Sequence, residues 1–418
     1  MLGPDNPKTL KTLNNLGRVD YFQGKYAEAE ALESQLLEIR RRVLGPQHAD
    51  TLYSMYFLAD VYTDEGKYAQ SEALHRQTLE IRRRVLGPEN RGALASMQSL
   101  ALVFYLEGKY AEAEALFSQT LEMQRRVLGP EYPSTLTCMG TLAMDYAAQG
   151  KYTQAEALFS QTLEIQRCIL GSEHSATLSS MHNLAEVYTA EGSYAQAEAL
   201  FSQTLEIQRR VLGPTHASTL MSMDSLAGTY RLSGRHAESE ALFSQTLGIQ
   251  RRVLGPEHPD TLLTLSDVAS IYQRQGKYVL AETYAAQALA GRRHALGPEH
   301  PDTMASAADL ALAYVSQGKF VESEPLAREA METDKKIQPD DWQRFRAESL
   351  LGASLSGEKK YAEAEPLLVE GYQGMLARKD RIAAPDRYHL DLAHRWVVQL
   401  YQAWGKPEKA AEWKARGD

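Results

Sequence analysis

The chain has 418 residues, of which 44% are hydrophobic and 24% are charged, and its formal net charge at pH 7 is −9. This balance excludes a disordered chain, and the negative charge argues against a nucleic-acid-binding protein. The only cysteines, Cys138 and Cys168, lack CxxC spacing, so we expect no disulfide framework and no structural zinc site, and interpret both as small apolar fillers. The sequence shows no signal-peptide pattern and no apolar run of membrane-spanning length, so we expect a cytoplasmic protein without a membrane segment.

The triplet Leu-Gly-Pro recurs along the chain every 42 residues. It begins at Leu2, Leu44, Leu86, Leu128, Leu212, Leu254 and Leu296, and Leu170-Gly171-Ser172 fills the remaining place. A fixed period of this size indicates one supersecondary unit copied end to end, in which each copy buries its apolar face against its neighbours. The chain is therefore predicted to form one elongated array.

The first unit, from Leu2 onward, departs from the others. Asp20 stands where later units place tyrosine or phenylalanine, and Glu33 stands where most of them place phenylalanine. An end unit can tolerate such polarity because one side has no neighbour. Since Leu2-Gly3-Pro4 is a helix-ending signal with no helix before it, we expect the chain to start at a repeat junction of a longer protein.

The fifth unit shows what one repeat contains. Apolar residues recur at three- and four-residue steps between Leu178 and Tyr188, and again between Tyr194 and Leu205. Each run predicts an amphipathic helix. Glu191-Gly192-Ser193 separates the two helices, and Leu-Gly-Pro ends the second one. Each unit is thus predicted to be a helix hairpin, with a small residue at the close helix contact. These small residues are Ala29, Ser71, Ala113, Ala155 and Ala281.

The last fifth of the chain drifts from the pattern. Ile337-Gln338-Pro339 stands where Leu-Gly-Pro would be expected, but one residue early. A ninth hairpin follows it. A tenth hairpin comes next and lacks a long second helix. All four tryptophans lie here: Trp342, Trp396, Trp404 and Trp413. We favour a cap that seals the apolar core over a tryptophan-lined ligand site. The predicted organisation is eight regular repeats over residues 1–336 and two divergent capping hairpins over residues 337–418, in one continuous solenoid.

These repeats resemble the tetratricopeptide repeat. The matching residues of the fifth unit are Leu184, Ala185, Tyr188, Gly192, Tyr194, Ala197 and Phe201. The 42-residue period, the basic ending Ile207-Gln208-Arg209-Arg210 and the segment Glu257-His258-Pro259-Asp260-Thr261 resemble the kinesin light chain variety, which bacterial proteins also use. The resemblance implies an all-α, right-handed superhelical solenoid of stacked antiparallel helix hairpins.

Repeated polar residues offer no catalytic or metal site. One histidine per repeat cannot converge on one ion, because packed helices lie about 10 Å apart whereas zinc to nitrogen bonds are about 2 Å; we expect these loop residues to make hydrogen bonds before the next helix. They are His48, His174, His216, His258 and His300, with Asn90 and Tyr132 in the same register. The arginines that end the second helices are expected to offset the helix dipole. We therefore predict no catalytic residue, no metal, no cofactor and no small-molecule substrate.

The first helices vary outside their core positions, whereas the second helices are nearly uniform. In tetratricopeptide proteins the first helices line the concave groove, so the resemblance places partner binding on these variable positions, and the aromatic and apolar content favours repeats two to four. The predicted groove residues are Asn14, Arg18, Tyr53, Tyr56, Phe57, Asp60, Gln98, Leu102, Tyr105, Met144, His182, Asn183 and Glu186. The Lys and Asn pair that clamps a terminal carboxylate in chaperone-binding relatives is not found there.

The sequence thus predicts a non-catalytic scaffold that docks a protein or peptide segment of unknown identity in its groove, without nucleic acid or membrane as partner. The alternative is a regulatory or sensor region of a larger signalling protein, such as a bacterial serine/threonine kinase, because the closing segment resembles the ends of repeat regions attached to such kinases. No kinase motif is present in this sequence.

Overall fold

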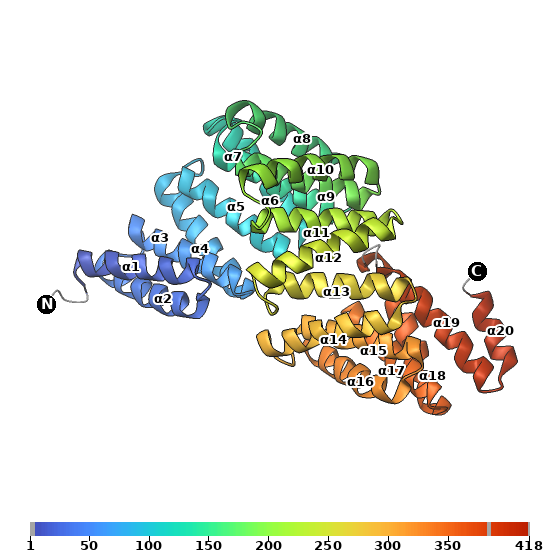
Figure 1. The fold of residues 1–418 in the computed structure, drawn as a ribbon. Coiled ribbons are helices and arrows are strands. Elements are labelled where there is room, and N and C mark those ends of the chain that lie inside the picture. Colours follow the sequence, from blue (N-terminus) through green and yellow to red (C-terminus); the bar gives the residue numbers. More distant parts are fainter. Residues whose placement is uncertain (1–4, 383–385, 417–418) are drawn as a thin grey trace. The chain divides into compact units, whose positions relative to one another are not determined.

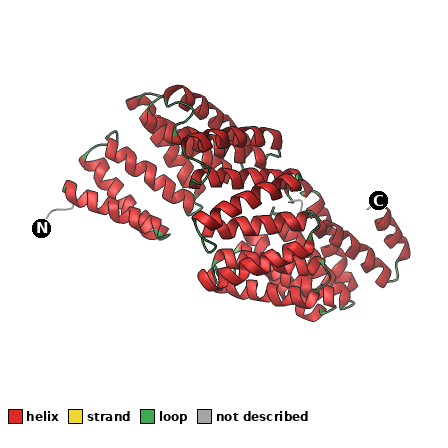
Figure 2. Ribbon diagram, turned by 45° about the horizontal axis from the view of Figure 1, so that its top comes forward, coloured by secondary structure: helices red, strands yellow, loops and turns green. Residues whose placement is uncertain are grey.

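The computed structural model describes residues 5–382 and 386–416. These residues form helices joined by short loops, with no strand among them (Figure 1, Figure 2). The α-helices are α1 (Pro7–Phe22), α2 (Tyr26–Val43), α3 (Ala49–Asp64), α4 (Tyr68–Leu86), α5 (Arg91–Leu106), α6 (Tyr110–Val127), α7 (Pro133–Ala148), α8 (Tyr152–Ile169), α9 (Ser175–Glu191), α10 (Tyr194–Val211), α11 (Ala217–Leu232), α12 (His236–Val253), α13 (Pro259–Arg274), α14 (Tyr278–Ala295), α15 (Pro301–Gln317), α16 (Phe320–Ile337), α17 (Trp342–Gly357), α18 (Tyr361–Leu376), α19 (Tyr388–Ala403) and α20 (Pro407–Ala415). A short 3₁₀ helix, η1 (Lys379–Arg381), follows α18.

The predicted helix hairpins and all-α solenoid are confirmed. Each 42-residue unit holds a first helix, a tight turn and a second helix. Gly192 ends α9 in the left-handed region with φ 90°, and Gly87 ends α4 with φ 93°, which a side chain would hinder. Residues 1–4, with the Leu-Gly-Pro of the expected repeat junction, lie outside the described residues.

The loop histidines cap the next helix, as expected. The Nδ1 atom of His48 accepts a hydrogen bond from the backbone N–H of Asp50 at 3.2 Å. His174, His216, His258 and His300 make the same contact, and Asn90 makes it with its amide oxygen. Each of these side chains satisfies one N–H group that a helix start would otherwise leave unpaired.

The chain divides into two compact units, residues 1–200 and residues 201–418. In the first unit each helix from α1 to α9 packs against the next one along the chain. Phe117, Met139 and Met97 are fully buried there, together with Ala113 and Ala155 at the predicted close contacts. The apolar stripes of the hairpins therefore meet within the stack, as the repeat pattern predicts.

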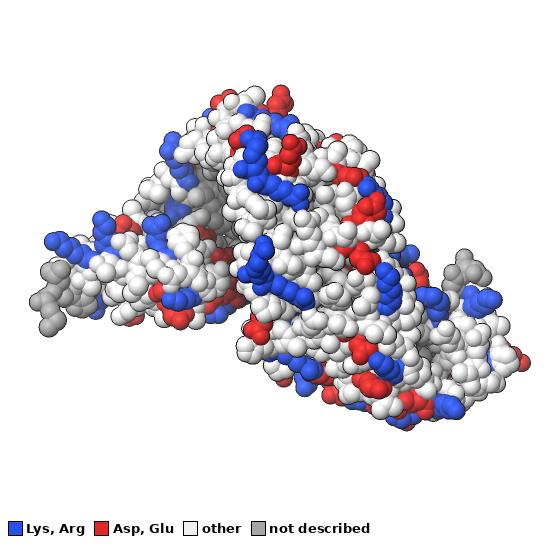
Figure 3. Space-filling view, viewed as in Figure 1, with Lys and Arg blue, Asp and Glu red and all other residues white. Residues whose placement is uncertain are grey.

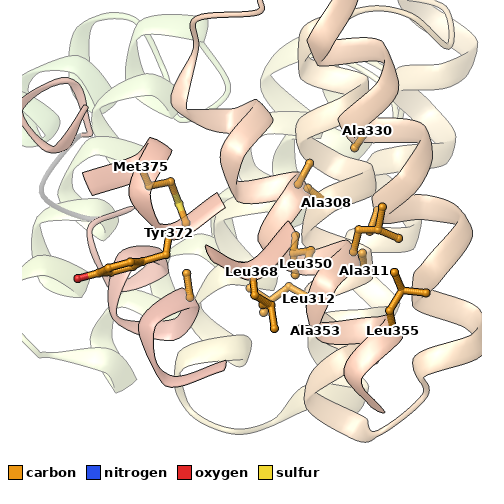
Figure 4. Packing of buried hydrophobic residues seen from close by; sticks show 14 of the residues in the cluster. Ala308, Ala311, Leu312, Ala330, Leu350, Ala353, Leu355, Leu368, Tyr372 and Met375 are labelled. Atoms are coloured by element: carbon orange, nitrogen blue, oxygen red, sulfur yellow. The ribbon is translucent and has the colours of Figure 1, made fainter. Parts of the chain in front are cut away.

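In the second unit consecutive helices from α11 to α20 pack in the same way. Its largest core cluster joins α15, α16, α17 and α18, where alanines on α15 and α16 admit the leucines of α17 and α18 (Figure 4). Gly352 on α17 lies so close to Leu368 on α18 that a Cβ atom there would come within 2.7 Å of Leu368 Cγ. This hairpin is packed through small residues more closely than a bulkier sequence would allow.

The tenth hairpin lacks a long second helix, as the sequence predicts. The second helix of the tenth hairpin, α20, has 9 residues, against 18 for α16. Trp413 is buried and meets Tyr372 edge to face at 5.7 Å between ring centroids, while Trp404 stacks on Tyr361 at 5.9 Å. The capping role of residues 337–418 stays a prediction.

Two sequence-based expectations about single residues are wrong. Cys168 is exposed rather than a buried filler, whereas Cys138 is buried as expected. Glu33 is fully buried although its position was interpreted as tolerant because it belongs to an end unit. Glu33 points at Gly17 of α1 inside its own hairpin, where a Cβ atom would come within 2.8 Å of Glu33 Oε1, so the missing outer neighbour does not expose it.

Candidate functional site

A pocket of about 400 Å³ opens between the first helices of repeats two to four. Tyr56 contributes from α3, the side chains from Arg91 to Leu102 contribute from α5, and Thr137 and Thr141 contribute from α7. Phe117 and Gln124 of α6 also line it, together with Leu128 and Tyr132 of the loop that joins α6 to α7. The structure therefore brings Tyr56, Gln98 and Leu102, three of the predicted groove residues, around one cavity.

Tyr56 is held firmly in this wall. Its hydroxyl lies 2.9 Å from Ser99 Oγ on α5, and the guanidinium of Arg82 lies 4.9 Å from the centre of its ring. Burial, followed by the nearby Asp60 carboxylate, raises the pKa of the Tyr56 hydroxyl. The Tyr56 side chain therefore joins α3 to α4 and α5.

Polar side chains also line the pocket, which otherwise has apolar walls. Gln124 Nε2 donates to Gln98 Oε1 at 3.1 Å, and Thr141 Oγ1 donates to the backbone carbonyls of Thr137 and Cys138. Arg91 is the charged residue of the lining, with its guanidinium 5.2 Å from the ring centre of Tyr132. Apolar walls with a few fixed polar groups are typical of binding pockets.

Two of the aromatic and apolar residues among the predicted groove residues, Tyr105 and Met144, lie outside this pocket. Tyr105 on α5 is half-buried beside Tyr110, with ring centroids 5.8 Å apart, and Met144 on α7 is 39% exposed. Burial is the main cause of a raised pKa at the Tyr105 hydroxyl. A partner segment that contacted Tyr56, Tyr105 and Met144 together would have to extend beyond the cavity at Tyr56.

Three predicted groove residues are buried within the stack. Phe57 is 7% exposed because it packs against Tyr21 at 5.2 Å between ring centroids. Asn14 is buried and accepts a hydrogen bond from Arg40 Nη1 at 3.1 Å. His182 is buried, burial lowers its pKa, and its Nε2 lies 3.7 Å from Glu186 Oε1. These side chains stabilise the stack and offer little surface to a partner.

The remaining predicted groove residues are dispersed. Arg18 and the 39% exposed Tyr53 line a separate pocket of about 730 Å³ at α1 and α3, and the buried Asn14 also forms part of its wall. Asp60 lies 3.4 Å from Nε2 of the buried His75, and burial raises the Asp60 pKa. Asn183 is half-buried on α9 and Glu186 is exposed.

Sequence reasoning missed the pocket residues outside the first helices. Gln124 and Leu128 belong to the nearly uniform end of a second helix, which was interpreted as scaffold. Tyr132 offered a signal, since it replaces the loop histidine of most other repeats and makes no side-chain cap of the following helix. Its ring is thereby left to line the pocket.

Arginines at the end of the second helices do more than offset the helix dipole. Arg40 and Arg82 are buried, and Nη1 of each donates to a serine of the next repeat, Ser54 at 2.6 Å and Ser96 at 2.8 Å. The expectation that such arginines act only on their own helix end is therefore incomplete. The exposed ones lie among acidic side chains, and basic and acidic groups are interspersed on the face shown in Figure 3.

In the second unit the first helices contact a later part of the same chain. The guanidinium of Arg274 on α13 lies 4.9 Å from the ring centre of Tyr388, and Trp342 lies 6.1 Å from His389. Burial raises the pKa of Tyr388 to about 12 and lowers that of His389 well below its usual value. Residues of this chain thus occupy part of the surface that first helices would otherwise offer to a partner.

Within the described residues, no group of three or more histidine, cysteine or acidic side chains is arranged to hold a metal ion. Among the described helices, none combines the length and the apolar character needed to cross a membrane.

The chain matches known proteins through its repeated hairpins. The sequence profile of the tetratricopeptide repeat matches residues 8–84, 50–125, 93–167, 175–252, 224–293 and 260–336. Among curated proteins, none matches this chain.

Solved structures with similar repeats include a putative kinesin light chain of Podospora anserina with nearly identical TPR-like repeats, which is 34% identical and covers 48% of this chain and 95% of that chain, with a TM-score of 0.45. BtubC (BKLC) from P. vanneervenii is 20% identical and covers 54% of this chain and 91% of its own, with a TM-score of 0.46. A signal transduction ATPase with numerous domains and a tetratricopeptide repeat sensor, from Pyrococcus horikoshii, is 13% identical and covers 93% of this chain and 52% of its own, with a TM-score of 0.54. This last likeness concerns the fold alone.

Proposed function

We propose that this chain, which belongs to the tetratricopeptide repeat family, is a non-catalytic scaffold that binds a protein or peptide segment on the first helices of repeats two to four. Tetratricopeptide repeats generally bind protein partners. The finer proposal, which concerns the place of binding, depends on the pocket of about 400 Å³ between α3, α5 and α7.

The pocket suits one large apolar side chain of a partner segment. Leu94 and Leu102 supply apolar area, and Tyr56 and Tyr132 supply aromatic walls. Ser134 and Thr137 add hydroxyl oxygens to the lining, and the Thr137 hydroxyl, which donates to the backbone carbonyl of Pro133, keeps its oxygen as an acceptor for a backbone N–H group. A buried apolar anchor surrounded by polar groups is the usual composition of an interaction hot spot.

A test must fill the pocket without disturbing the stack. Tyr56→Ala is unsuitable because it also removes the contacts of Tyr56 with Ser99 and Arg82. Thr137 is exposed at the pocket wall, so Thr137→Trp should occupy the cavity and leave stability unchanged. Thr153→Trp is the matched control, since Thr153 is an exposed threonine of α8 that does not line the pocket.

The measurement begins with peptides selected on the chain from a phage-displayed random library, followed by fluorescence anisotropy with each purified variant. Loss of a hot-spot contact costs about 2 kcal/mol, so Thr137→Trp should weaken the Kd of the selected peptides roughly 30-fold. Thr153→Trp should leave the Kd unchanged. If Arg125→Ala with Arg126→Ala abolished binding while Thr137→Trp had no effect, the site would lie on the second helices and this proposal would be wrong.

The same groove would serve a regulatory or sensor region of a larger signalling protein. The Pyrococcus horikoshii protein carries a tetratricopeptide repeat sensor, and this chain spans 52% of its length. In that role a segment of the same polypeptide would compete with the selected peptides for the groove. The apparent Kd of the peptides would therefore be higher when it is measured on the larger protein than on the isolated repeats. An unchanged Kd would favour the scaffold role.

A further inference from the structure

A side chain of the second helix donates a hydrogen bond to an oxygen atom on its own first helix at the same place in three repeats. The pairs are Arg40 with Asn14 at 3.1 Å, Gln124 with Gln98 at 3.1 Å, and Gln250 with Asp224 at 2.8 Å. The donor follows the acceptor by 26 residues in each pair. These two positions of the repeat therefore form a buried polar contact between the helices of one hairpin.

The fourth repeat departs from this pairing. Its donor position holds Gln166 on α8, but its acceptor position holds Gly140 on α7, which has no side chain. Gln166 is 6% exposed, and its side-chain amide makes no hydrogen bond with any residue that the structure describes. A buried amide without a partner is unfavourable and rare in folded proteins. Gln166 thus lacks the acceptor that the equivalent residues have.

Space for the missing side chain remains at Gly140. Apart from its own stretch of α7, a Cβ atom at Gly140 would have its nearest neighbour, Phe159 Cε1, at 4.0 Å. Gly140 is half-buried, so this gap opens to solvent. The covered atom of the Gln166 amide is Oε1, as it is in Gln124, whereas Nε2 keeps accessible surface. The atom left accessible is therefore the one that donates in the third repeat.

The gap adjoins the pocket of about 400 Å³ between α3, α5 and α7. Thr137, one helical turn before Gly140, and Thr141, directly after it, both line that pocket. Gln98 and Gln124, which occupy the equivalent positions one repeat earlier, line it as well. A segment held in the pocket would therefore pass within reach of the gap.

We propose that the gap at Gly140 is a subsite for an asparagine or glutamine side chain of the partner segment, whose amide oxygen accepts a hydrogen bond from Gln166 Nε2. This inference rests on the proposed function, because the same segment would fill the adjoining pocket. In the third repeat the amide of Gln98 occupies the equivalent place and accepts the equivalent bond from Gln124. The partner would supply what Gly140 omits.

A neutral amide suits this subsite better than a carboxylate. Asp224 places a carboxylate at the equivalent position of the sixth repeat, where Gln250 and Thr264 both donate to it. Burial nevertheless raises the pKa of Asp224 to about 7. A carboxylate is thus disfavoured at this depth even with two donors, and an apolar side chain would leave Gln166 unpaired.

The first test selects peptides on the parent chain from a phage-displayed random library. Their sequences should share an apolar residue and, at a fixed spacing from it, an asparagine or glutamine. Selection on Gly140→Gln should keep the apolar residue and lose the amide, because the added side chain would pair with Gln166 as Gln98 pairs with Gln124. Peptides without the shared amide, or an amide preference that persists on Gly140→Gln, would overturn the proposal.

The second test measures the Kd of a selected peptide by fluorescence anisotropy. Replacement of its asparagine or glutamine by leucine should weaken binding to the parent chain roughly fivefold, as expected for one neutral hydrogen bond. The same replacement should have no effect on Gln166→Leu, which exchanges an unpaired buried amide for an apolar group and should remain folded in urea denaturation. A fivefold loss that persists on Gln166→Leu would show that the peptide amide binds elsewhere.

Gln154→Leu is the matched control, since Gln154 is an exposed glutamine of the same helix and should leave the fivefold difference intact. In a further peptide, glutamate in place of the amide residue should bind more weakly than the amide at pH 8, and equal binding would contradict a neutral subsite. If Thr137→Trp weakened binding but Gln166→Leu left the peptide replacement fully effective, this inference alone would be wrong. If Thr137→Trp had no effect while Gln166→Leu removed the difference, the proposed pocket would be wrong and the subsite would stand.

Discussion

At the scale of single residues, the repeat pattern predicts apolar positions well and polar ones poorly. The small residues at the close helix contact, such as Ala113 and Ala155, are fully buried as their spacing predicts. Glu33, Asn14 and Arg40 are buried too, although their chemistry suggests exposure. Whether a polar side chain is buried depends on a partner in another helix, and spacing along one helix does not contain that information.

Glu33 provides a test of this burial. Burial raises the pKa of its carboxyl from 4.5 to about 7, while Arg40 and Ser54 act in the opposite direction. The folded state therefore holds this proton more tightly than the unfolded state, and the chain loses stability as pH rises from about 4.5 to 7. Glu33→Gln should raise the free energy of unfolding by up to about 3 kcal/mol at pH 8 and have little effect at pH 4.

Urea denaturation at the two pH values, followed by circular dichroism, measures this difference. Glu38→Gln is the control, because Glu38 is an exposed glutamate of the same helix. Equal stability of Glu33→Gln and the parent chain at pH 8 would show that Glu33 reaches water.

At the scale of helices, the 42-residue period predicts the hairpins because glycine and proline mark their ends. The helices α2, α4 and α6 each begin at the tyrosine of a Gly-Lys-Tyr sequence, at Tyr26, Tyr68 and Tyr110. The candidate site is less predictable. The first helices α3, α5 and α7 contribute to the pocket, but Gln124 and Leu128 come from a second helix and its end. Helix periodicity assigns each residue to a face, whereas a pocket depends on which faces of several helices converge.

The contact between the helices of one hairpin can be tested at Ala155 on α8. Ala155 is fully buried between helices, so Ala155→Leu should overpack the contact and lower the free energy of unfolding by about 1 to 3 kcal/mol. Thermal and urea unfolding would measure the change. Ala157→Leu on the exposed side of the same helix should change little, and equal stability of both variants would show that the position is not a close contact.

At the scale of the whole molecule, each unit is a stack in which neighbours cover one another. The apolar side of α16, with Ala327 and Ala330, is buried in the cluster that includes Leu350 and Leu351 of α17. A stack of this kind has two terminal surfaces, and its solubility depends on how they are closed. The repeat profile ends at residue 336, so the final hairpins come from sequence that has diverged from it.

Removal of residues 338–418 should therefore expose the apolar side of α16. We expect the shortened chain to self-associate and to lose solubility, as measured by size-exclusion chromatography with light scattering. The shortened chain with Leu312→Glu and Ala330→Glu is the control. The added negative charges on the exposed surface of one copy would repel those on another copy and so prevent self-association. A shortened chain that stays monomeric and equally soluble would show that residues 338–418 are not a cap.

Side-chain hydrogen bonds link neighbouring hairpins, for example that of Lys409 with Glu365, which are 44 residues apart in the sequence. During synthesis, each hairpin would therefore find its partner in the hairpin released just before it, so that order could grow from the N-terminus while the ribosome is still adding residues. Tyr388 is different, because it meets Arg274, which was made 114 residues earlier. That contact can form only after residue 388 has been synthesised, so it must follow the synthesis of every hairpin between α13 and α18.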